Sequence, residues 1–285
     1  MASMRSIKRR KESVQSTQQI TKAMKLVSTV KLQRSKTRAE QSKDYFTCMY
    51  ATVKSMLAKV GEVNHPYLKA PDTSKKGVIV ITSNRGLAGG YNSNVIKLVT
   101  NGDFVKEDLK VYAIGKKGKD ALSKKGYEIA GDYSDFIEDP VYVEAMQICE
   151  QVLKAYADGE IGEIYLAYTA FKNTVSHVPT LLKLLPVEQG EADGEVSDTN
   201  AMMNFEMDEA EALDMIIPKY VTSLIYGGMV EAVASENGAR MQAMDSATSN
   251  AEEMIDKLSL QYNRARQGSI TQELTEIIAG AQAIS

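Results

Sequence analysis

Two glycine-rich segments could most readily do chemistry, because a glycine-rich loop between a strand and a helix can bind phosphate groups. Each follows an apolar run, one at residues 83–92 (SNRGLAGGYN) and one at residues 115–119 (GKKGK). The first lacks the G-x-G-x-x-G spacing. The second has two residues where a P-loop needs four, and Asp120 where it needs Ser or Thr. We therefore favour a tight structural turn at each segment, with a bound nucleotide as the alternative.

Other chemically active residues are scattered. The motifs G-x-S-x-G, H-E-x-x-H and C-x-x-C are absent, as is the kinase set. Neither the cysteines, Cys48 and Cys149, nor the histidines, His65 and His177, have metal-ligand spacing. The carboxylates are typical of solvent-exposed surfaces, and no pair of them stands out as a catalytic acid and base. We expect no catalytic residue, no metal site and no cofactor.

Composition indicates a folded protein that does not span a membrane. Of the 285 residues, 44% are hydrophobic and 25% are charged, which is typical of one large or two small folded domains. No run of about 18 apolar residues is present, and polar sequence follows the basic start. We expect the chain to stay in the cytosol and to reach a membrane only through a partner.

Charge is distributed very unevenly. Residues 1–43 carry twelve Lys and Arg against two Glu, so the rest of the chain sums to −13 although the total is only −3. A basic segment of this kind could bind nucleic acid, an anionic membrane surface or an acidic protein environment. It lacks the interleaved aromatic residues of a single-strand platform, since Tyr45 and Phe46 come only at its end. Charge alone leaves these alternatives open.

Both ends of the chain predict long helices. Residues 3–60 contain neither Pro nor Gly, and a helix of that length approaches 85 Å. Residues 208–284 predict a second helix of about 115 Å, with Pro218 in its early turns. Glycines at four positions predict places where this helix bends or loosens: Gly227, Gly228, Gly238 and Gly268.

A 3-4 spacing runs through each predicted helix and indicates a coiled coil. Because the first helix ends where the middle of the chain begins and the last helix starts where that part finishes, the two can run side by side only if antiparallel. Many of its positions are small or polar. A second face of the first helix carries Ile20, Met24 and Val27, which predicts contact on more than one side. The frames are Met4, Ile7, Lys11, Val14, Gln18, Thr21, Lys25, Ser28, Leu32, Ser35, Ala39, Ser42, Phe46, Met49, Val53 and Met56 in the first helix and Leu213, Ile216, Tyr220, Ser223, Gly227, Val230, Ala234, Asn237, Met241, Met244, Thr248, Ala251, Ile255, Leu258, Tyr262 and Ala265 in the second.

The middle of the chain alternates predicted strands and helices, which indicates a small Rossmann-like domain with a parallel sheet. The strands are 77–83, 110–114 and 163–171, and one helix is 140–157. Residues 188–214 hold ten Asp and Glu without Lys or Arg, and 188–204 read as a loop. We therefore predict three parts: a coiled-coil helix (1–60), an α/β domain with an acidic loop (61–207) and a second coiled-coil helix (208–285). Both helices should point away from the domain, with the C-terminal tip as a single helix or a further partner for the N-terminal segment.

Three segments resemble one known family. Residues 6–36 (SIKRRKESVQSTQQITKAMKLVSTVKLQRSK) and 241–284 (MQAMDSATSNAEEMIDKLSLQYNRARQGSITQELTEIIAGAQAI) resemble the terminal helices of bacterial F-type ATP synthase gamma subunits. Residues 83–92 look like that family's central-domain loop. The match covers the whole chain in order.

The resemblance implies a rotor axle that is not itself catalytic. Its coiled coil would lie inside a ring of three alpha and three beta subunits, with the α/β domain near the ring of c subunits. It would also imply an epsilon subunit as a partner, no nucleic acid, no homo-oligomer, and a peripheral place on the cytoplasmic side of the bacterial membrane. Rotation would couple proton or sodium flow to ATP synthesis or hydrolysis at the beta subunits. The small and polar seam suggests a further hypothesis, that a shaft inside a sleeve must avoid strong adhesion at any one angle.

The resemblance also assigns contact residues. Arg266, Gln267, Thr271 and Glu273 match family positions that contact a loop of the beta subunit, and their donors and acceptors suit that role. Met24 matches a position that faces the same subunit.

Other positions agree with the family less fully. Phe205 and Glu206 fall where the family has an aromatic-acidic segment near the c ring, but Met207 stands where a proline is expected. The chloroplast members' cysteine-containing regulatory insertion is absent, which argues against redox control by that route. Gly268 replaces a better helix former and should soften the contact segment.

Two other classes of protein fit parts of the sequence. An enzyme with a nucleotide-binding α/β domain and a long helical arm would show a measurable dissociation constant for a mononucleotide. A purely structural coiled-coil adaptor accounts for the helices but leaves the α/β domain and the end motifs without a reason.

Overall fold

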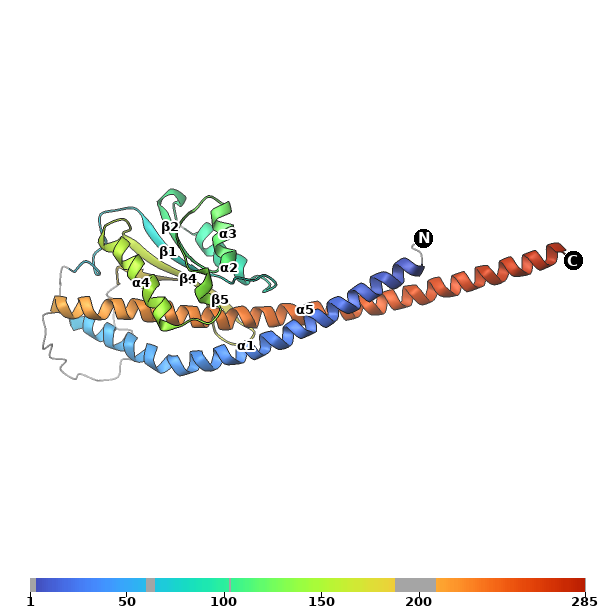
Figure 1. Ribbon diagram of the computed structural model, residues 1–285. Helices are drawn as coiled ribbons and strands as arrows, with labels where there is room; N and C mark the ends of the chain where they lie inside the picture. The colour runs from blue at the N-terminus through green and yellow to red at the C-terminus, as the bar shows by residue number, and fades with distance from the viewer. Residues whose placement is uncertain (1–3, 60–64, 103, 188–208, 285) are drawn as a thin grey trace. The chain divides into compact units, whose positions relative to one another are not determined.

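The computed structural model describes residues 4–59, 65–102, 104–187 and 209–284. The chain forms two compact units. The shaft unit comprises residues up to 29 together with those from 240 onward, and the sheet unit comprises residues 30–239. Helix α1 (Met4–Lys59) and helix α5 (Glu209–Ile284) each contribute to both units. Figure 1 labels the elements.

The sheet unit is built on five strands in the order β3-β2-β1-β4-β5. Four of them are parallel, and the edge strand β5 pairs antiparallel with β4 through a short hairpin. The predicted α/β fold with long terminal helices is thus confirmed, with one unpredicted antiparallel edge. The strands are β1 (Lys76–Ile81), β2 (Leu109–Ile114), β3 (Glu128–Asp132), β4 (Glu163–Phe171) and β5 (His177–Leu185).

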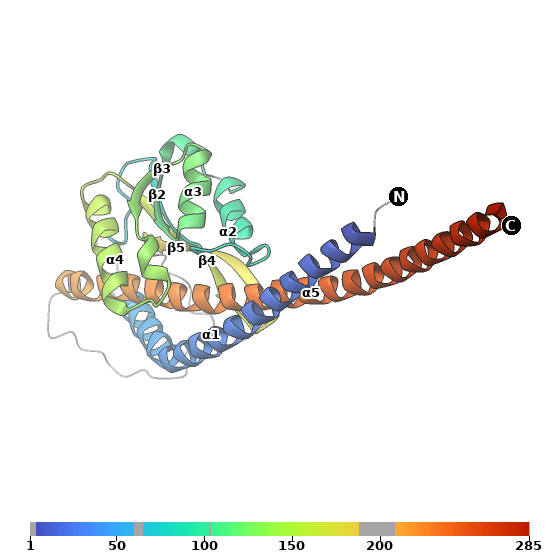
Figure 2. The same ribbon diagram turned by 45° about the vertical axis from the view of Figure 1, so that its right-hand side comes forward.

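Shorter helices follow the strands. Helices α2 and α3 lie on one face of the sheet and helix α4 on the other, as two views of the ribbon show (Figures 1 and 2). Successive side chains of β1 point to opposite faces, so Val78 and Val80 meet α2 while Ile79 and Ile81 face α4 and α5. The elements are α2 (Tyr91–Thr100), α3 (Lys116–Lys124), α4 (Tyr142–Ala157) and the 3-10 turns η1 (Lys106–Asp108) and η2 (Ser134–Ile137).

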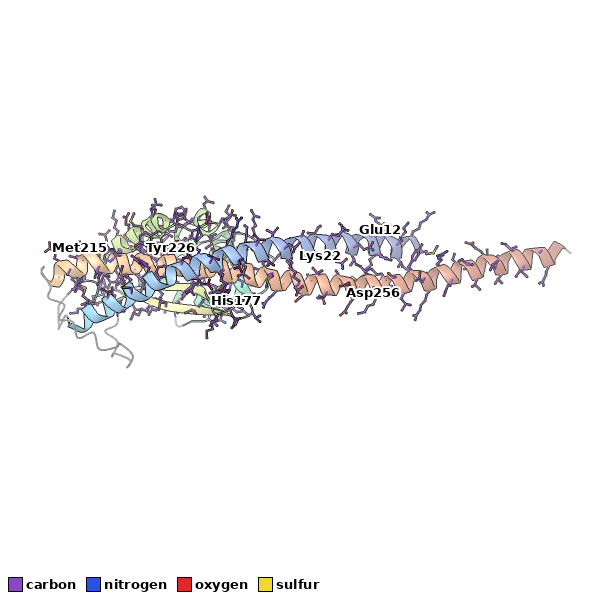
Figure 3. All side chains as sticks on the ribbon, turned by 90° about the horizontal axis from the view of Figure 1, so that it is seen from below. Glu12, Lys22, His177, Met215, Tyr226 and Asp256 are labelled. Carbon is purple, nitrogen blue, oxygen red and sulfur yellow. The ribbon has the colours of Figure 1, made fainter. Side chains whose placement is uncertain are left out.

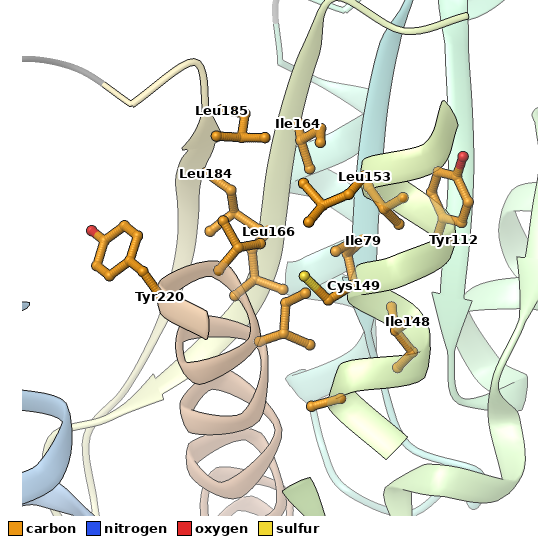
Figure 4. Packing of buried hydrophobic residues seen from close by; sticks show 14 of the residues in the cluster. Ile79, Tyr112, Ile148, Cys149, Leu153, Ile164, Leu166, Leu184, Leu185 and Tyr220 are labelled. Carbon is orange, nitrogen blue, oxygen red and sulfur yellow. The ribbon is translucent and has the colours of Figure 1, made fainter. Parts of the chain in front are cut away.

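The larger core lies on the α4 side of the sheet. Ile79, Leu166 and Leu184 of the sheet are fully or almost fully buried there against Ile148 and Cys149 of α4 (Figure 4). Side chains of α5 and α1 complete the same core, among them Leu213, Ile217, Val221, Val53 and Met56. The expectation that both terminal helices point away from the α/β domain is therefore wrong for their segments in the sheet unit. Helix α4 alone leaves part of the apolar face uncovered, and α5 covers it.

In the shaft unit, α1 and α5 run antiparallel, as predicted. Thr21 is opposite Thr248 and Lys25 is opposite Asp245, so Met4 lies level with about residue 265. The least exposed side chains of this unit belong to the predicted frames, including Thr21, Ser28, Met244, Ala251 and Leu258. Helix α5 continues past the end of α1 as a single exposed helix, which confirms one of the two predicted forms of the tip. None of the described helices is long and apolar enough to cross a membrane.

The predicted weak points do not interrupt the last helix. Helix α5 is continuous through Pro218 and through all its glycines. Gly227 lies against the Phe46 ring, where an added Cβ would be 3.4 Å from a ring carbon, and Gly238 lies against His177. Glycine at these positions allows close approach of neighbouring elements, whereas Gly268 faces open space.

The central strand should dominate the stability of the sheet unit. Ile79→Ala removes a fully buried side chain and should lower the free energy of unfolding by about 2–5 kcal/mol. Ile278→Ala, at a position with 57% exposure, should change it by no more than about 0.5 kcal/mol. Equilibrium urea unfolding of the full chain measures both. Equal effects would contradict this placement of the core.

Candidate functional sites

The loop at the carboxyl end of β1 binds its own polar groups. The Ser83 N–H donates to Asn92 Oδ1 over 2.9 Å, Asn92 Nδ2 donates to Ser83 Oγ over 2.8 Å, and Ser83 Oγ also contacts the Arg85 carbonyl. Leu87, at the tip, is 62% exposed and has a φ of 64°, an uncommon value for a residue with a Cβ. These bonds hold residues 83–92 as a closed turn.

The second glycine-rich segment begins α3, where free N–H groups could bind an anion. Its first four N–H groups are all engaged within the chain. Gly115, at φ 106°, has no room for a side chain, since an added Cβ would lie 2.0 Å from the Thr82 carbonyl oxygen. The four bonds are Lys116 N–H to Asn84 Oδ1 (2.9 Å), Lys117 N–H to Ser83 O (3.1 Å), Gly118 N–H to Thr82 Oγ1 (2.8 Å) and Lys119 N–H to Gly115 O (3.3 Å).

The two glycine-rich segments therefore hold each other. Two donors of the second segment bind Asn84 and Ser83 of the first, and a third binds Thr82 just before it, in place of a phosphate. The adjacent Lys119 side chain is also paired, 2.7 Å from Asp132, and this hydrogen bond holds the pKa of Asp132 below its usual range. The geometry supports the structural turn over the nucleotide site.

The cysteines and histidines occupy four separate places. Cys149 is buried, and burial raises the pKa of its thiol to about 11, so it stays protonated at neutral pH. Cys48 is exposed. His65 Nε2 lies 3.2 Å from Asp214, and His177 packs on Phe171. Among the described residues, no group of three or more His, Cys, Asp and Glu side chains could hold a metal ion.

A cavity of about 450 Å³ lies between α1 and α5 in the sheet unit. Its lining residues are apolar except for a thiol, two hydroxyl groups and an ammonium group, and no catalytic set borders it. The lining residues are Tyr45, Cys48, Met49, Thr52, Met56, Ala212, Met215, Ile216 and Lys219.

The residues predicted to contact the beta subunit all belong to the shaft unit. Arg266, Gln267, Thr271 and Glu273 are exposed on the single-helix tip, and Thr271 Oγ1 donates to the Gln267 carbonyl over 2.9 Å. Met24 is half-buried and lies level with about residue 246, roughly 30 Å along the helix from Arg266. The structure therefore gathers four of these residues and separates Met24 from them. Phe205 and Glu206 lie outside the described residues.

Hydroxyl groups form part of the seam of the shaft unit. Thr21 Oγ1 and Thr248 Oγ1 lie 2.8 Å apart, and each also lies within 3.0 Å of a carbonyl of its own helix. Each hydroxyl has one proton, so one of them donates across the seam and the other to its own helix. The nearby Lys25–Asp245 ion pair is largely exposed and contributes little, under about 1 kcal/mol.

The outer surface of α1 carries apolar as well as basic side chains. Ile20, Leu26 and Val27 are more than half exposed in the shaft unit, which agrees with the predicted second face. Basic residues such as Lys22 lie outside the seam, as does Asp256 of α5 (Figure 3). Exposed apolar side chains among the basic ones favour a protein surface over a nucleic acid as the surroundings of this helix.

One cluster of buried and partly buried polar residues was missed by the sequence reasoning. Glu231 and Ser235 of α5 meet the ends of β4 and β5, near Thr169 and His177. Burial raises the pKa of Glu231 and lowers that of His177, so each favours its neutral form. A sequence pattern could have found this cluster, because the last helix carries a second 3-4 frame formed by Ile217, Val221, Leu224, Gly228, Glu231, Ser235 and Gly238.

The sequence matches known proteins over its full length. A family model described as ATP synthase matches residues 3–284. The chain is 64% identical to an ATP synthase gamma chain of Lachnoclostridium phytofermentans, covering all of both chains. It is 40% identical to a sodium-ion-specific ATP synthase gamma chain of Acetobacterium woodii, covering 98% of both chains.

Solved structures share the fold at lower identity. A chain of the Euglena gracilis mitochondrial ATP synthase aligns with a TM-score of 0.70 and 19% identity, covering 99% of this chain and 94% of that one. A chain of the Tetrahymena thermophila central stalk and c-ring structure aligns with a TM-score of 0.60 and 24% identity, covering 80% and 99%.

The threonine pair of the seam should behave as a coupled unit. Thr248→Val removes one partner of a part-buried hydrogen bond and should destabilise the local pairing by about 1 kcal/mol. The double variant Thr21→Val/Thr248→Val should cost less than the sum of the two single changes, because neither hydroxyl is left unpaired. Hydrogen exchange of residues 240–255 measures the effect. Strict additivity would contradict the coupling.

The two cysteines should differ sharply in reactivity. An alkylating reagent at pH 8 should modify Cys48 rapidly and Cys149 only after unfolding, because Cys149 is buried and its pKa is raised to about 11. Mass spectrometry of the native chain should show one adduct, and Cys48→Ser should abolish it. Rapid double labelling without denaturant would contradict the burial of Cys149.

Proposed function

The chain belongs to the gamma-subunit family of F-type ATP synthases, and from this we propose that it is the central rotor shaft of such a complex. It couples the flow of protons or sodium ions through a c-subunit ring to ATP synthesis or hydrolysis on the beta subunits. The chain contributes mechanics and no catalytic residue. The observation that carries the proposal is the exposed single helix beyond residue 265, which bears the four matched contact residues.

The cross-section of the shaft unit supports rotary coupling. Two helices lie side by side up to about residue 265, and one continues beyond it. Neither the two-helix part nor the single-helix part has threefold symmetry. Three equivalent beta subunits around the shaft therefore meet three different surfaces. Each subunit then changes its affinity for nucleotide because its contact free energy with the shaft depends on the rotational angle.

The tip also has the surface expected of a helix that turns inside a sleeve. Ile270, Leu274, Ile277 and Ile278 are between 45% and 68% exposed. Apolar contact is non-directional and changes little as one surface slides over another, unlike a hydrogen bond. A tip with apolar side chains and few polar anchors can therefore rotate without being bound strongly at any one angle.

The polar anchors are Arg266, Gln267, Thr271 and Glu273. In our proposal Arg266 and Gln267 donate hydrogen bonds to a loop of the beta subunit, while Thr271 and Glu273 accept them. All four are exposed, and no ion pair among the described residues involves Arg266 or Glu273. Met24 contacts the same subunit at another level of the shaft.

In our proposal the α/β domain faces the ion-driven ring of c subunits. We assign three functional segments: residues 1–60 and 208–285 as the shaft helices and residues 61–207 as the domain near the c ring. Phe205 and Glu206 contact the ring, and an epsilon subunit binds beside it. In this arrangement one copy serves three alpha and three beta subunits, and the chain stays peripheral on the cytoplasmic side of the membrane, held through the ring.

The rival proposal, a nucleotide-binding enzyme with a helical arm, has less support. Its phosphate site would need free N–H groups at the start of α3, and these groups bind Asn84, Ser83 and Thr82. Co-expression with alpha and beta subunits, followed by subunit ratio and ATP hydrolysis, separates the two. One copy per three alpha and three beta, with activity that depends on it, supports the rotor. A free chain that binds a mononucleotide supports the enzyme.

The contact residues should matter in the assembled complex. Gln267→Ala removes one proposed hydrogen bond to the beta subunit, a loss of about 1–2 kcal/mol that should lower ATP hydrolysis about five- to thirtyfold. The matched control is Gln272→Ala, on the same exposed helix, whose side chain bonds Glu276 within its own helix. The control should keep the wild-type rate. Equal rates for all three proteins would count against this contact.

A further inference from the structure

Helix α5 has two different contact faces in the sheet unit. The coiled-coil frame, with Gly227, Val230 and Ala234, faces α1, as the contact of Gly227 with Phe46 shows. The second frame, one residue on, carries Gly228, Glu231, Ser235 and Gly238. These four residues span ten positions, about 15 Å of helix, and all of them contact β4 or β5.

Two of the four contacts are close approaches in which an added Cβ would force a neighbouring side chain to shift. A Cβ at Gly228 would lie 2.9 Å from Leu166 Cδ2, with Ile81 also within 3.5 Å. A Cβ at Gly238 would lie 2.4 Å from His177 Nε2. That nitrogen is buried and has no hydrogen-bond partner among the described residues, and the imidazole ring packs on Phe171. Figure 3 shows His177 beside α5.

The other two contacts are hydrogen bonds to the backbone of β4, one buried and one part-buried. Ser235 Oγ donates to the Thr169 carbonyl over 3.1 Å, and Ser235 is fully buried. Glu231 Oε2 accepts from the Phe171 N–H over 3.2 Å, at the last residue of the strand. Both bonds are directional, so they fix the rotation of the helix as well as its distance from the sheet.

No neighbouring register of α5 reproduces this set. If α5 rotated about its own axis by the angle of one residue, about 100°, Glu231 and Ser235 would lose their partners. Asn237 or Ala239 would then face His177 in place of Gly238. A slide by one helical turn, about 5.4 Å, brings Leu224 or Glu231 to the place of Gly228. Apolar side chains alone would resist such shifts less, because apolar contact has no direction.

We propose that Gly228, Glu231, Ser235 and Gly238 of α5, with Leu166, Thr169, Phe171 and His177 of the sheet, form a torque lock that stops α5 from turning or sliding on the sheet. The inference rests on the proposed rotor function. Torque applied to the sheet unit then enters α5 at the lock and continues along the same unbroken helix. The four α5 residues are positioning residues that touch no substrate.

The first test adds one methyl group at the closest approach. Gly238→Ala places that group against His177, whereas the matched control Gly227→Ala adds it to the same helix on the face toward α1, where the nearest atom, a ring carbon of Phe46, would lie at an ordinary contact distance of 3.4 Å. The readout is ion transport per ATP hydrolysed, measured in inverted membrane vesicles that contain the whole complex, with a pH-sensitive dye or radioactive sodium. Gly238→Ala should lower this ratio by about twofold or more, and Gly227→Ala should leave it unchanged.

The second test removes the obstruction. In the double variant His177→Ala/Gly238→Ala the added methyl group has room, so the transport ratio should return toward wild type. Such non-additivity is expected only if the two residues act through their mutual contact. Additive losses would overturn the lock.

The third test works even if Gly238→Ala fails to assemble. Glu231→Gln keeps an acceptor for the Phe171 N–H and should retain coupling, whereas Glu231→Ala removes it and should lower the ratio. A purely structural role predicts that hydrolysis and transport fall together at a constant ratio, and that result would overturn the proposal. A wild-type chain that does not assemble with alpha and beta subunits would instead contradict the rotor function.

Discussion

The two apolar faces of the central sheet must both be shielded from water, and the rest of the structure follows from how this is achieved. Helices α2 and α3 cover one face, but α4 covers only part of the other, where Ile79, Leu166 and Leu184 are buried. The first half of α5 completes that cover, with help from α1. The hydrophobic burial that stabilises the sheet therefore also fixes the long helix to it. Because α5 is one uninterrupted helix, a single apolar core anchors an element that reaches far beyond that core.

The shaft unit is held together in a different way. Its seam contains Thr21, Ser28 and Thr248 together with Met244, Ala251 and Leu258, so it buries little apolar surface and relies partly on hydroxyl groups. Two helices with such a seam are marginal alone in water, and partners that bind the folded form stabilise it further. A weakly adhesive seam and an exposed tip suit a shaft whose ordered surroundings are other subunits, consistent with the proposed role.

The glycines of this chain lie in three different environments. Gly115 adopts a positive φ in a turn that has no room for a side chain, Gly238 brings a helix against an imidazole, and Gly268 faces open space. Only the first resembles a phosphate-binding loop in its sequence context, and there the neighbouring N–H groups are already bound by Asn84, Ser83 and Thr82. The same residue type thus gives no functional information until its neighbours are known.

Local pattern determined much of this protein: the 3-4 frames and the strands at 77–83, 110–114 and 163–171 depend on periodicity that neighbouring residues carry, and the antiparallel pairing follows from the order of the segments along the chain. The end motifs likewise placed the four proposed contact residues on one segment. Tertiary structure decided the rest. The contacts of Glu231 and Gly238 depend on residues about 60 positions away, and β5 pairs antiparallel with β4 rather than extending the parallel sheet. One-dimensional periodicity does not record which distant surface a second helical face will meet. Whether the glycine-rich segment at the start of α3 forms a structural turn or a phosphate site was also decided only by tertiary structure, because it depends on which distant atoms accept hydrogen bonds from its N–H groups.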